Sequence, residues 1–193
     1  VLKARRLLEK TILPFLSEVS GQNFVFRHIN FDTREIFVTT NQSPNGVPLH
    51  ALGQGICGIM GWLGYFVKRL WETNSILSDC TQAHAILLID EIDTHLHPKW
   101  QSRLLDALLN YVPNTQFVVT TNSAIAVTHT KNNAMGVYEI TQHGVQQLRA
   151  SGQHIGTFLL NAFGVSDRAE FAQNLIDNLF LSMNEDDLDM DIL

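Results

Sequence analysis

The stretch AHAILLIDEIDTHLHPKW, residues 83–100, decides the fold. Its first half is an apolar run that ends abruptly at Asp90 and Glu91. An unbroken apolar run of this length is typical of a strand buried on both faces of a parallel sheet. The polar residues that follow leave three interpretations open: a metal site, a phosphate-hydrolysing site, or the solvated end of a buried strand.

The residues after this stretch predict a second parallel strand. HPKWQSRLLDALLNY, residues 97–111, has Pro98 in its expected first turn and apolar residues along one face, which indicates a helix. TQFVVTT, residues 115–121, is a second apolar run. Strand, helix and strand in this order form a βαβ unit with a right-handed crossover.

Both predicted strands end in residues that carry chemistry. Asp90 and Glu91 end the first strand, and the run from Thr120 through Thr121 and Asn122 to Ser123 ends the second. Ligands of open α/β sheets bind at the carboxyl ends of the strands. Of two adjacent carboxylates, one can hold a metal through water while the other orients a nucleophilic water. This division suits nucleotide hydrolysis, in which positioning and charge stabilisation do most of the work.

The rest of the chain predicts helices and hairpins around this parallel sheet. The expected elements are a helix over 2–18, two strands within 23–41 that meet at Asp32 and Thr33, a helix over 55–72, a hairpin around 141–144, and helices over 153–163 and 167–183. We therefore expect an α/β fold in one domain, residues 1–193, with flanking helices and peripheral β-hairpins.

Composition indicates a globular protein of the reducing cytoplasm. The chain is 45% hydrophobic and 17% charged, and its net charge of −6 argues against a surface that is basic overall. Cys57 and Cys80 are too few for a disulfide framework. Residues 49–67 approach the length of a membrane span, but their apolar part, 55–67, is shorter than a span. We expect no membrane association.

Four stretches together resemble one family. ILLIDEID, residues 86–93, resembles the Walker B strand and catalytic glutamate of ABC-type ATPase heads, and THLHPKWQ, 94–101, is similar to the D-loop of bacterial ATPases related to SMC, OLD-family and Septu-type anti-phage proteins. FVVTTNSAIAV, 117–127, is similar to their strand that ends in the switch histidine. LHALGQGICGIMGWL, 49–63, resembles the signature motif and its helix.

The resemblance implies a parallel-sheet fold of the P-loop NTPase kind, of which this chain is the C-terminal lobe. Its implied segments are a signature region at 49–72, Walker B and D-loop at 85–98, a switch strand at 116–123, C-terminal helices at 153–183 and an acidic tail at 184–193. It also implies ATP and Mg²⁺ as ligands, and a role in defence or DNA repair. DNA or a nuclease partner is implied by the resemblance alone.

The resemblance also assigns roles to single residues. Asp90 is expected to bind the hydration shell of Mg²⁺, and Glu91 to polarise the attacking water, while Asn122 takes the place of the switch histidine. Gly53, Gln54 and Gly55 are expected to approach the γ-phosphate of ATP held by another subunit, since the helix that starts there aims its N–H groups at that phosphate. His95 and His97 are expected in the loop that faces the partner subunit of a homodimer.

Three residues depart from the family pattern. Gly53 replaces the signature serine and so removes a hydroxyl donor. Asn122 replaces a histidine, and its amide can donate a hydrogen bond but cannot carry a positive charge. His97 stands where transporter-like heads often have aspartate. We expect slow hydrolysis, or ATP used mainly as an assembly signal.

The 193 residues contain no Gly-x-x-x-x-Gly-Lys-Ser/Thr phosphate loop. Without that loop an ATPase head cannot cradle the β-phosphate. We therefore expect an N-terminal lobe that contains the loop to be a partner, and this chain alone to be inactive.

Two other functions remain open. A metal-dependent nuclease site could use Asp90, Glu91 and Asp93 with His95 or His97, because carboxylates and imidazole bind divalent ions. A degenerate head could dimerise or dock a partner without catalysis, as the departures at Gly53 and Asn122 favour.

The glycines at 55, 58, 61 and 64 recur along the helix predicted over 55–72. Each costs about 1 kcal/mol relative to alanine inside a helix. Such a cost favours close backbone packing, with Trp62, Leu63, Phe66 and Leu70 supplying the buried apolar surface.

Overall fold

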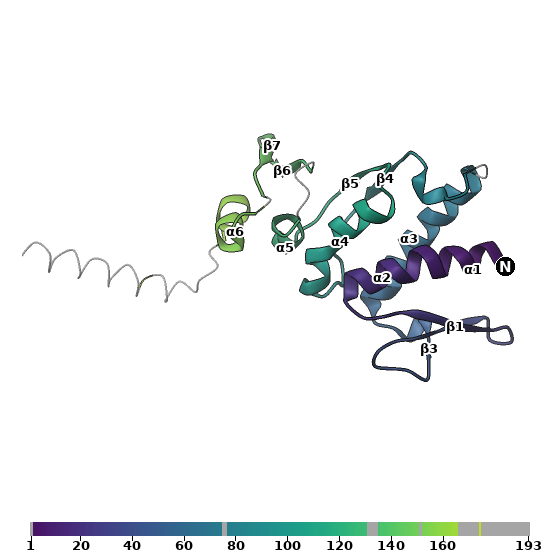
Figure 1. The fold of residues 1–193 in the computed structure, drawn as a ribbon. Helices are drawn as coiled ribbons and strands as arrows, with labels where there is room; N and C mark the ends of the chain where they lie inside the picture. The colour runs from purple at the N-terminus through teal and green to yellow at the C-terminus, as the bar shows by residue number, and fades with distance from the viewer. Residues whose placement is uncertain (1, 75–76, 131–134, 151, 166–173, 175–193) are drawn as a thin grey trace, which may run out of the picture. The chain divides into compact units, whose positions relative to one another are not determined.

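The structure, a computed structural model, describes residues 2–74, 77–130, 135–150, 152–165 and 174 (Figure 1). The chain divides into two compact units, residues 1–135 and 136–193, which are described separately. The assignment of residues 1–193 to a single domain stays a prediction. The helix predicted over 167–183, apart from residue 174, and the acidic tail at 184–193 lie outside the described residues.

The first unit begins with one continuous helical path in three pieces. α1 (Leu2–Leu7) runs into a π-helical turn, η1 (Leu8–Ile12), which runs into α2 (Leu13–Ser20). Gly21 ends the path with a φ of 71°, a left-handed conformation that glycine adopts without a steric penalty. The helix predicted over 2–18 is confirmed, and the π-helical turn was not predicted.

An antiparallel sheet follows the helical path. β1 (Val25–Asn30) pairs with β2 (Glu35–Thr39), and β2 pairs with the short β3 (Val47–Pro48). The Asn30 side chain accepts hydrogen bonds from the N–H groups of Asp32 and Thr33, which fixes the turn between β1 and β2. The predicted hairpin is confirmed, and β3 was not predicted.

Helix α3 (Gln54–Thr73) follows a 3-10 turn, η2 (Leu49–Ala51). Its core-facing side buries Ile56, Ile59, Leu63, Phe66, Val67 and Leu70. Neither α3 nor any other helix among the described residues has the length and hydropathy needed to span a membrane.

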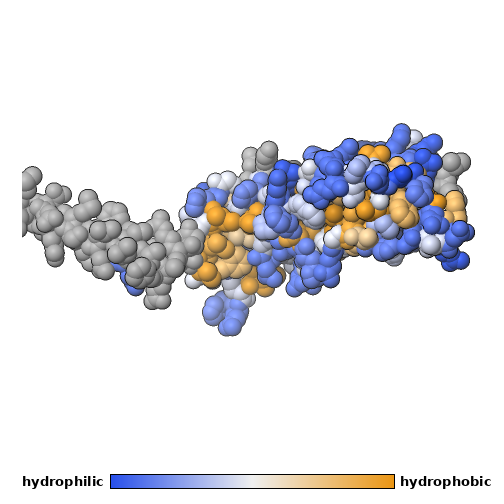
Figure 2. Space-filling view, turned by 90° about the horizontal axis from the view of Figure 1, so that it is seen from below, coloured by the Kyte–Doolittle hydropathy of each residue, from blue (hydrophilic) through white to orange (hydrophobic). Residues whose placement is uncertain are grey.

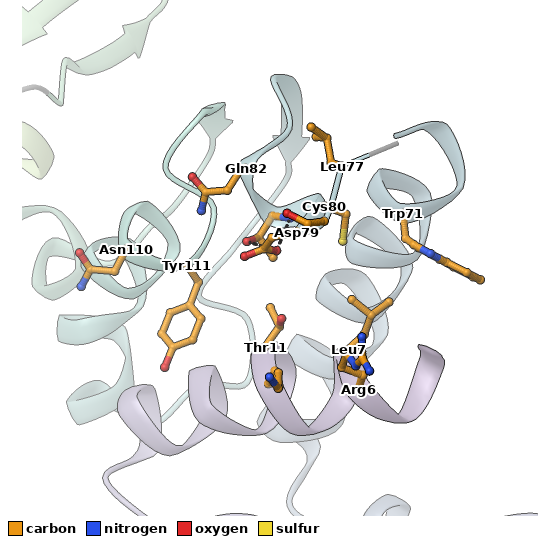
Figure 3. Close-up of a pocket in the computed structure, with 13 residues that line it drawn as sticks. Arg6, Leu7, Thr11, Trp71, Leu77, Asp79, Cys80, Gln82, Asn110 and Tyr111 are labelled. Atoms are coloured by element: carbon orange, nitrogen blue, oxygen red, sulfur yellow. Dashed lines mark hydrogen bonds between the residues drawn. The ribbon is translucent and has the colours of Figure 1, made fainter. Parts of the chain in front are cut away.

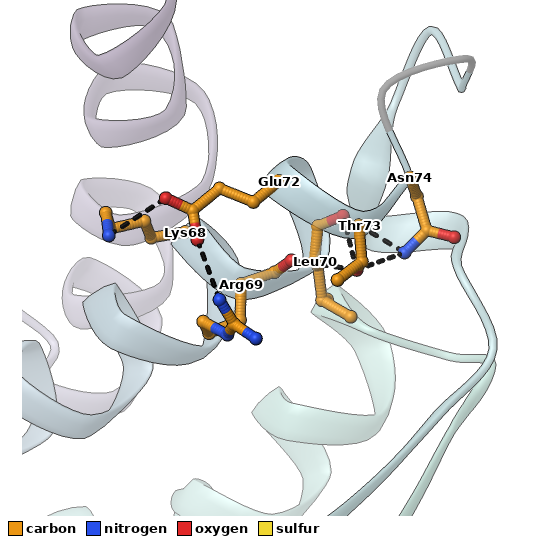
Figure 4. A network of polar contacts seen from close by, with 6 residues as sticks. All are labelled: Lys68, Arg69, Leu70, Glu72, Thr73 and Asn74. Carbon is orange, nitrogen blue, oxygen red and sulfur yellow. Dashed lines mark hydrogen bonds and ion pairs between the residues drawn. The ribbon is translucent and has the colours of Figure 1, made fainter.

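The last turns of α3 carry a network of polar contacts (Figure 4). Glu72 forms ion pairs with Lys68, at 2.9 Å, and with Arg69, at 3.1 Å. The Lys68 ammonium and, more weakly, the Arg69 guanidinium lower the pKa of the Glu72 carboxyl. The basic residues of this helix are therefore already paired with a carboxylate inside the chain.

The βαβ unit is present as predicted. After a second 3-10 turn, η3 (Cys80–Gln82), β4 (Ala85–Ile89) leads through α4 (Pro98–Tyr111) to β5 (Thr115–Val119). The two strands are parallel, in a register that runs from Ala85 opposite Thr115 to Ile89 opposite Val119.

The prediction that both faces of this sheet are buried is wrong for the described residues. Alternate side chains of β4 and β5 pack against the core, among them Leu87 and Phe117. The side chains on the other face are open, with Ile86 65%, Leu88 72% and Val118 52% exposed. Alternation of this kind is what a strand with one covered face shows.

The core of the first unit lies between its helices. Helix α2 packs against α4, where the rings of Phe15 and Tyr111 meet edge to face with their centroids 5.6 Å apart. The short helix α5 (Ala124–Thr128), which was not predicted, packs against α4 as well. The most fully buried large side chains are Leu13, Phe15, Leu16, Val19, Val38, Ile59, Leu63, Val67, Leu104, Leu108 and Val112.

The second unit contains a hairpin and a helix. β6 (Val137–Thr141) pairs antiparallel with β7 (Gly144–Leu148), which confirms the predicted hairpin, and α6 (Ile155–Phe163) confirms the helix predicted over 153–163. Figure 2 shows apolar residues gathered over the α6 region, where Leu160, Phe163 and Val165 are exposed.

Candidate functional site

The carboxyl ends of β4 and β5 lie side by side. The Thr120 N–H donates to the Ile89 carbonyl at 3.0 Å, and the Ile92 N–H donates to the Thr120 carbonyl at 3.1 Å. The parallel ladder therefore continues one step past the strands. This places Asp90 and Glu91 next to the polar residues that follow β5, as the sequence predicted.

A single threonine hydroxyl joins the two strand ends. The Thr120 hydroxyl donates to the Asp90 carboxylate and accepts a hydrogen bond from the Glu91 N–H, with 2.8 Å between N and O. Only Oδ1 of Asp90 takes part, so within the described residues its second oxygen has no hydrogen-bond partner. Asp90 is exposed and can present that oxygen to a ligand.

The loop after Asp90 is held in an uncommon backbone conformation. Glu91 has a φ of 49° and His95 a φ of 63°, both in the left-handed region. For a residue other than glycine this region costs about 1–2 kcal/mol. The turn is closed by hydrogen bonds from the Thr94 N–H to the Glu91 carbonyl and from the Leu96 N–H to the Asp93 carbonyl, both at 3.0 Å. Backbone strain that the surrounding structure holds in place is a common property of functional loops.

A second threonine hydroxyl holds Asp93. Thr121 donates to the Asp93 carboxylate and accepts from the Ser123 N–H at 3.0 Å. The Ser123 hydroxyl donates to Gln101 at 2.8 Å, and the Gln101 amide donates to the Leu96 carbonyl at 3.1 Å. The end of β5 thus contacts both ends of the loop over residues 91–97.

The start of α3 lies against the same loop. A Cβ placed on Gly55 would be 2.7 Å from the His95 carbonyl oxygen and 2.9 Å from a Leu96 methyl, so an alanine at this position would clash. Gly53 is the N-cap of α3, and both Gly53 and Gln54 are exposed. The structure therefore brings Gly55, one of the three predicted signature residues, next to His95.

The other glycines of α3 do not pack closely, contrary to the prediction. A Cβ on Gly58 or Gly61 would meet no atom within 4 Å, and on Gly64 it would meet only a methyl of Ile12, at 3.9 Å. Gly58 and Gly61 are exposed because they lie on the side of the helix away from the buried residues. Within the described residues, only Gly55 of this series is required by a close contact.

Of the predicted residues His95, His97 and Asn122, His97 is the one whose side chain forms a hydrogen bond within the described residues. The His97 ring nitrogen Nδ1 accepts from the Lys99 N–H at 3.2 Å and so caps α4. Asn122 and His95 are exposed, and within the part of the chain that the structure describes neither side chain has a hydrogen-bond partner. The roles of these three residues stay predictions.

The three carboxylates of the loop do not form a metal-binding group. Among the described residues no three side chains of His, Cys, Asp or Glu converge on a point that could hold a metal ion. Asp93 is engaged by Thr121. The nuclease alternative built on Asp90, Glu91 and Asp93 therefore lacks its geometric basis. A lone exposed carboxylate does fit Mg²⁺ in nucleotide sites, where one or two carboxylates and the substrate phosphates hold the ion.

A cavity of about 570 Å³ lies elsewhere in the first unit (Figure 3). Its lining includes Asp79 and Cys80, which precede β4, and Tyr111, which precedes β5. It therefore lies toward the amino ends of the strands, away from Asp90. Burial raises the pKa of the Cys80 thiol, and the Asp79 charge adds to this effect. Burial, with a further contribution from Glu18, raises the pKa of the Tyr111 hydroxyl.

Sequence comparisons relate the chain to named ATPases. Residues 74–127 match the family described as "AAA domain, putative AbiEii toxin, Type IV TA system". The chain is 24% identical over 170 residues to the retron Vc95 probable ATPase of Vibrio cholerae, which covers 88% of this chain and 32% of the relative. It is 39% identical over 72 residues to the retron Ec83 probable ATPase of Escherichia coli, across 37% of this chain and 13% of the relative.

A third relative is the Septu protein PtuA of Bacillus mycoides, 44% identical over 45 residues, which covers 23% of this chain and 6% of the relative. Over these matched segments the chain is similar in sequence to the ATPases of retron and Septu systems. The segment spans about a third of the length of the Vc95 relative.

A solved structure shows the same fold. It is described as "Structural biochemistry of ATP-driven dimerization and DNA stimulated activation of SMC ATPases", and it superimposes on this chain with a TM-score of 0.53 at 13% identity. The superposition covers 86% of this chain and 97% of the solved chain. The fold class predicted from the sequence is thereby confirmed.

The sequence places Thr120 and Thr121 at the end of the second strand but does not reveal what their hydroxyls contact. Thr120 and Thr121 are the residues that hold Asp90, Glu91 and Asp93. One signal could have found the first contact. If the two apolar runs are aligned at their carboxyl ends, Asp90 falls opposite Thr120, in agreement with the observed register.

Proposed function

We propose that this ATPase head contributes the carboxyl-terminal part of an ATP-hydrolysing site in a longer or two-chain defence ATPase. The observation that carries the proposal is the adjacency of the β4 and β5 ends, which groups Asp90 and Glu91 with the residues up to Asn122. The segment assignments, from the signature region at 49–72 to the switch strand at 116–123, belong to the same proposal.

In this site each strand-end side chain has a separate task. Glu91 orients and polarises the attacking water, because its carboxylate is exposed at a position fixed by its own backbone N–H. Asn122 donates a hydrogen bond toward the γ-phosphate. Neutral amide donation is weaker than donation from a charged histidine, which is the basis for expecting slow turnover.

Asp90 is the proposed contact to Mg²⁺, through the carboxylate oxygen that Thr120 leaves open. When bound, Mg²⁺ supplies charge neutralisation to the phosphates. The Asp90 carboxylate supplies a hard oxygen ligand of the type that this ion prefers.

A further lobe is proposed to supply the phosphate loop. The apolar face of β4 and β5, with Ile86, Leu88 and Val118, is open among the described residues. Burying apolar surface contributes about 25 cal/mol per Å², so an element that covers this face gains stability. Relatives such as the Vc95 ATPase have about three times the matched length, which leaves room for such a lobe.

The first turn of α3 and the loop are proposed to act on ATP bound by a second copy of the protein. Gly53 is the N-cap and Gln54 and Gly55 begin the helix, whose first-turn N–H groups carry partial positive charge. His95 and His97 lie in the loop against which Gly55 packs. The start of α3 and the two histidines would therefore face the partner subunit from the same surface.

Phosphate release by the intact protein, phosphate-loop lobe included, tests the proposal. We expect Mg²⁺-dependent ATP turnover that falls at least a hundredfold in Glu91→Gln, with nucleotide binding retained, because only the water-orienting group is lost. Asp90→Ala is expected to lose both Mg²⁺-dependent binding and turnover. Unchanged turnover in Glu91→Gln would refute this assignment.

A docking function without turnover is the second candidate, favoured by Gly53 and Asn122. Gly53 has open space around it, so no steric demand explains the missing serine. ATP-dependent dimerisation of the wild-type protein without any phosphate release would establish this candidate in place of the first.

The biological setting is proposed from the relatives. Because the relatives are retron ATPases and Septu PtuA, we propose a role in defence with DNA or a nuclease as partner. Loss of phage protection in cells that carry Glu91→Gln in the complete system, with protein levels unchanged, is the expected result. Full protection by that variant would contradict this setting.

A further inference from the structure

We infer that Thr120 and Thr121, here called the threonine pair, are positioning residues that fix the Asp90 carboxylate and the loop over 91–97 for the Mg²⁺-nucleotide. This inference rests on the proposed function for its ligand. The contacts themselves are given by the structure.

Each hydroxyl of the threonine pair both donates and accepts a hydrogen bond. A hydroxyl has one proton to donate and lone pairs that accept. Thr120 donates to Asp90 and accepts from the Glu91 N–H, and Thr121 donates to Asp93 and accepts from the Ser123 N–H. Because its one proton goes to an aspartate, neither hydroxyl can donate to a ligand at the same time.

The contacts of Thr120 constrain two neighbouring carboxylates differently. Asp90 is held through its own side chain: one carboxylate oxygen bonds to Thr120, and the other has no hydrogen-bond partner among the described residues. Glu91 is held through its backbone N–H, in a left-handed conformation, and among the described residues its side chain bonds only to the Thr94 hydroxyl, at 3.2 Å. Thr120 therefore separates a metal-facing carboxylate from a water-facing one.

The contacts of Thr121 extend the constraint to the far end of the loop. Asp93 accepts from the Leu96 N–H through its carbonyl, and the Ser123 hydroxyl reaches Leu96 through Gln101. Asn122 lies between Thr121 and Ser123 and is exposed. The end of β5 is thus anchored on both sides of the residue proposed to meet the γ-phosphate.

The test compares valine and serine at each position in the intact protein. Valine keeps the shape of threonine and removes the hydroxyl, whereas serine keeps the hydroxyl. Thr39→Val is the matched control, because Thr39 is a strand residue of the same unit whose hydroxyl, within the described part of the chain, reaches only the Val25 carbonyl, at 3.5 Å. Circular dichroism and urea denaturation verify that each variant is folded.

Amide hydrogen exchange, resolved to single residues by fragmentation mass spectrometry, is the readout that needs no nucleotide. We expect Thr120→Val to speed exchange of the Glu91 amide about tenfold, and Thr121→Val to do the same at Ser123, because each amide loses its acceptor. Thr120→Ser, Thr121→Ser and Thr39→Val are expected to exchange as wild type. Unchanged exchange in both valine variants would overturn the inference.

Binding of a fluorescent ATP analogue, titrated with Mg²⁺, is the second readout. Losing a hydrogen bond to a charged group is expected to raise the Mg²⁺ concentration for half-maximal binding about tenfold in Thr120→Val. Thr120→Ser is expected to stay within about twofold of wild type. If wild type binds with Mg²⁺ dependence and Thr120→Val matches it, the inference alone fails. If wild type shows no Mg²⁺-dependent binding, the proposed function fails and the inference falls with it.

Discussion

Helix α3 holds four glycines, and Gly55 in its first turn differs most from Gly58 and Gly61, which lie further along the helix. Gly55 is buried, and the space for a Cβ is taken by the His95 carbonyl and Leu96. Gly58 and Gly61 are exposed, and a Cβ on either would meet nothing within 4 Å. The same residue type thus serves a close contact at one position and none, among the described residues, at the others.

This difference divides α3 into a first turn, which contacts the loop of the candidate site, and a middle part, whose glycines contact no part of that loop. The loop over 91–97 can approach the helix because Gly55 has no side chain. The exposed glycines weaken the helix by about 1 kcal/mol each, and no contact within the described chain compensates. Substitutions along α3 should therefore divide into two classes.

The largest expected effect is that of Gly55→Ala. The added methyl must displace a backbone carbonyl and a buried leucine, and overpacking of this kind costs about 1–3 kcal/mol. We expect the free energy of unfolding, from urea denaturation, to fall by about 2 kcal/mol. ATP turnover of the intact protein should fall as well, because the loop shifts. Stability equal to wild type would show that the loop does not need this approach.

The opposite sign is expected for Gly58→Ala and Gly61→Ala. Each should raise the free energy of unfolding by about 1 kcal/mol, since alanine restricts the unfolded chain and favours the helix. The double variant should gain about the sum of the two. The measurement is the same urea denaturation, with Gly55→Ala as the contrasting variant. A loss of stability in either single variant would contradict the exposure of this helix face.

The sequence could not distinguish these glycines, because their spacing is regular and only the neighbouring loop makes them different. Gly55 is contacted by residues some 40 positions later in the chain. The length and position of α3 were predictable from its apolar residues. The contact partner of each glycine was not, since it depends on where the βαβ unit places residues 95 and 96.

For the parallel strands too, the sequence predicted the elements but not their surroundings. The apolar runs predicted β4 and β5, and the change from apolar to polar residues predicted where they end. An unbroken apolar run cannot show whether one face or both are covered, because Ile86 and Leu87 are equally apolar. Their opposite environments follow from the strand period of two and from the element that packs on one face only.

The candidate site was predictable in its location and less so in its internal contacts. Asp90 and Glu91 stood out because two carboxylates end an apolar strand. The threonine pair did not, because threonine is common in strands and its role depends on pairing with residues about 30 positions away. Side-chain hydrogen bonds across strand ends need the register as well as the elements.

Gly64→Ala is expected to raise the free energy of unfolding by less than the double variant Gly58→Ala, Gly61→Ala does. Its Cβ would lie 3.9 Å from the Ile12 methyl, an ordinary van der Waals distance. Helix propensity should contribute about 1 kcal/mol, and the new contact a few tenths more. Gly64→Ser is the matched control, since it adds a polar atom toward the same methyl and should gain less. A decrease for Gly64→Ala in urea denaturation would show that η1 and α3 are packed more tightly than the distance indicates.

The smallest effect on stability, and the most direct test of the site, is expected for Gly53→Ser. Gly53 has an extended backbone with φ −54° and ψ 154°, which serine adopts, and open space for the side chain. As an N-cap, serine should stabilise the protein by only a few tenths of a kcal/mol relative to glycine.

The serine hydroxyl restores the donor of the signature motif, so we expect ATP turnover of the intact Gly53→Ser protein to rise by up to about tenfold. Gly53→Ala adds the carbon without the hydroxyl and should not raise turnover. Equal turnover in the serine and alanine variants would mean that this helix start does not meet the γ-phosphate.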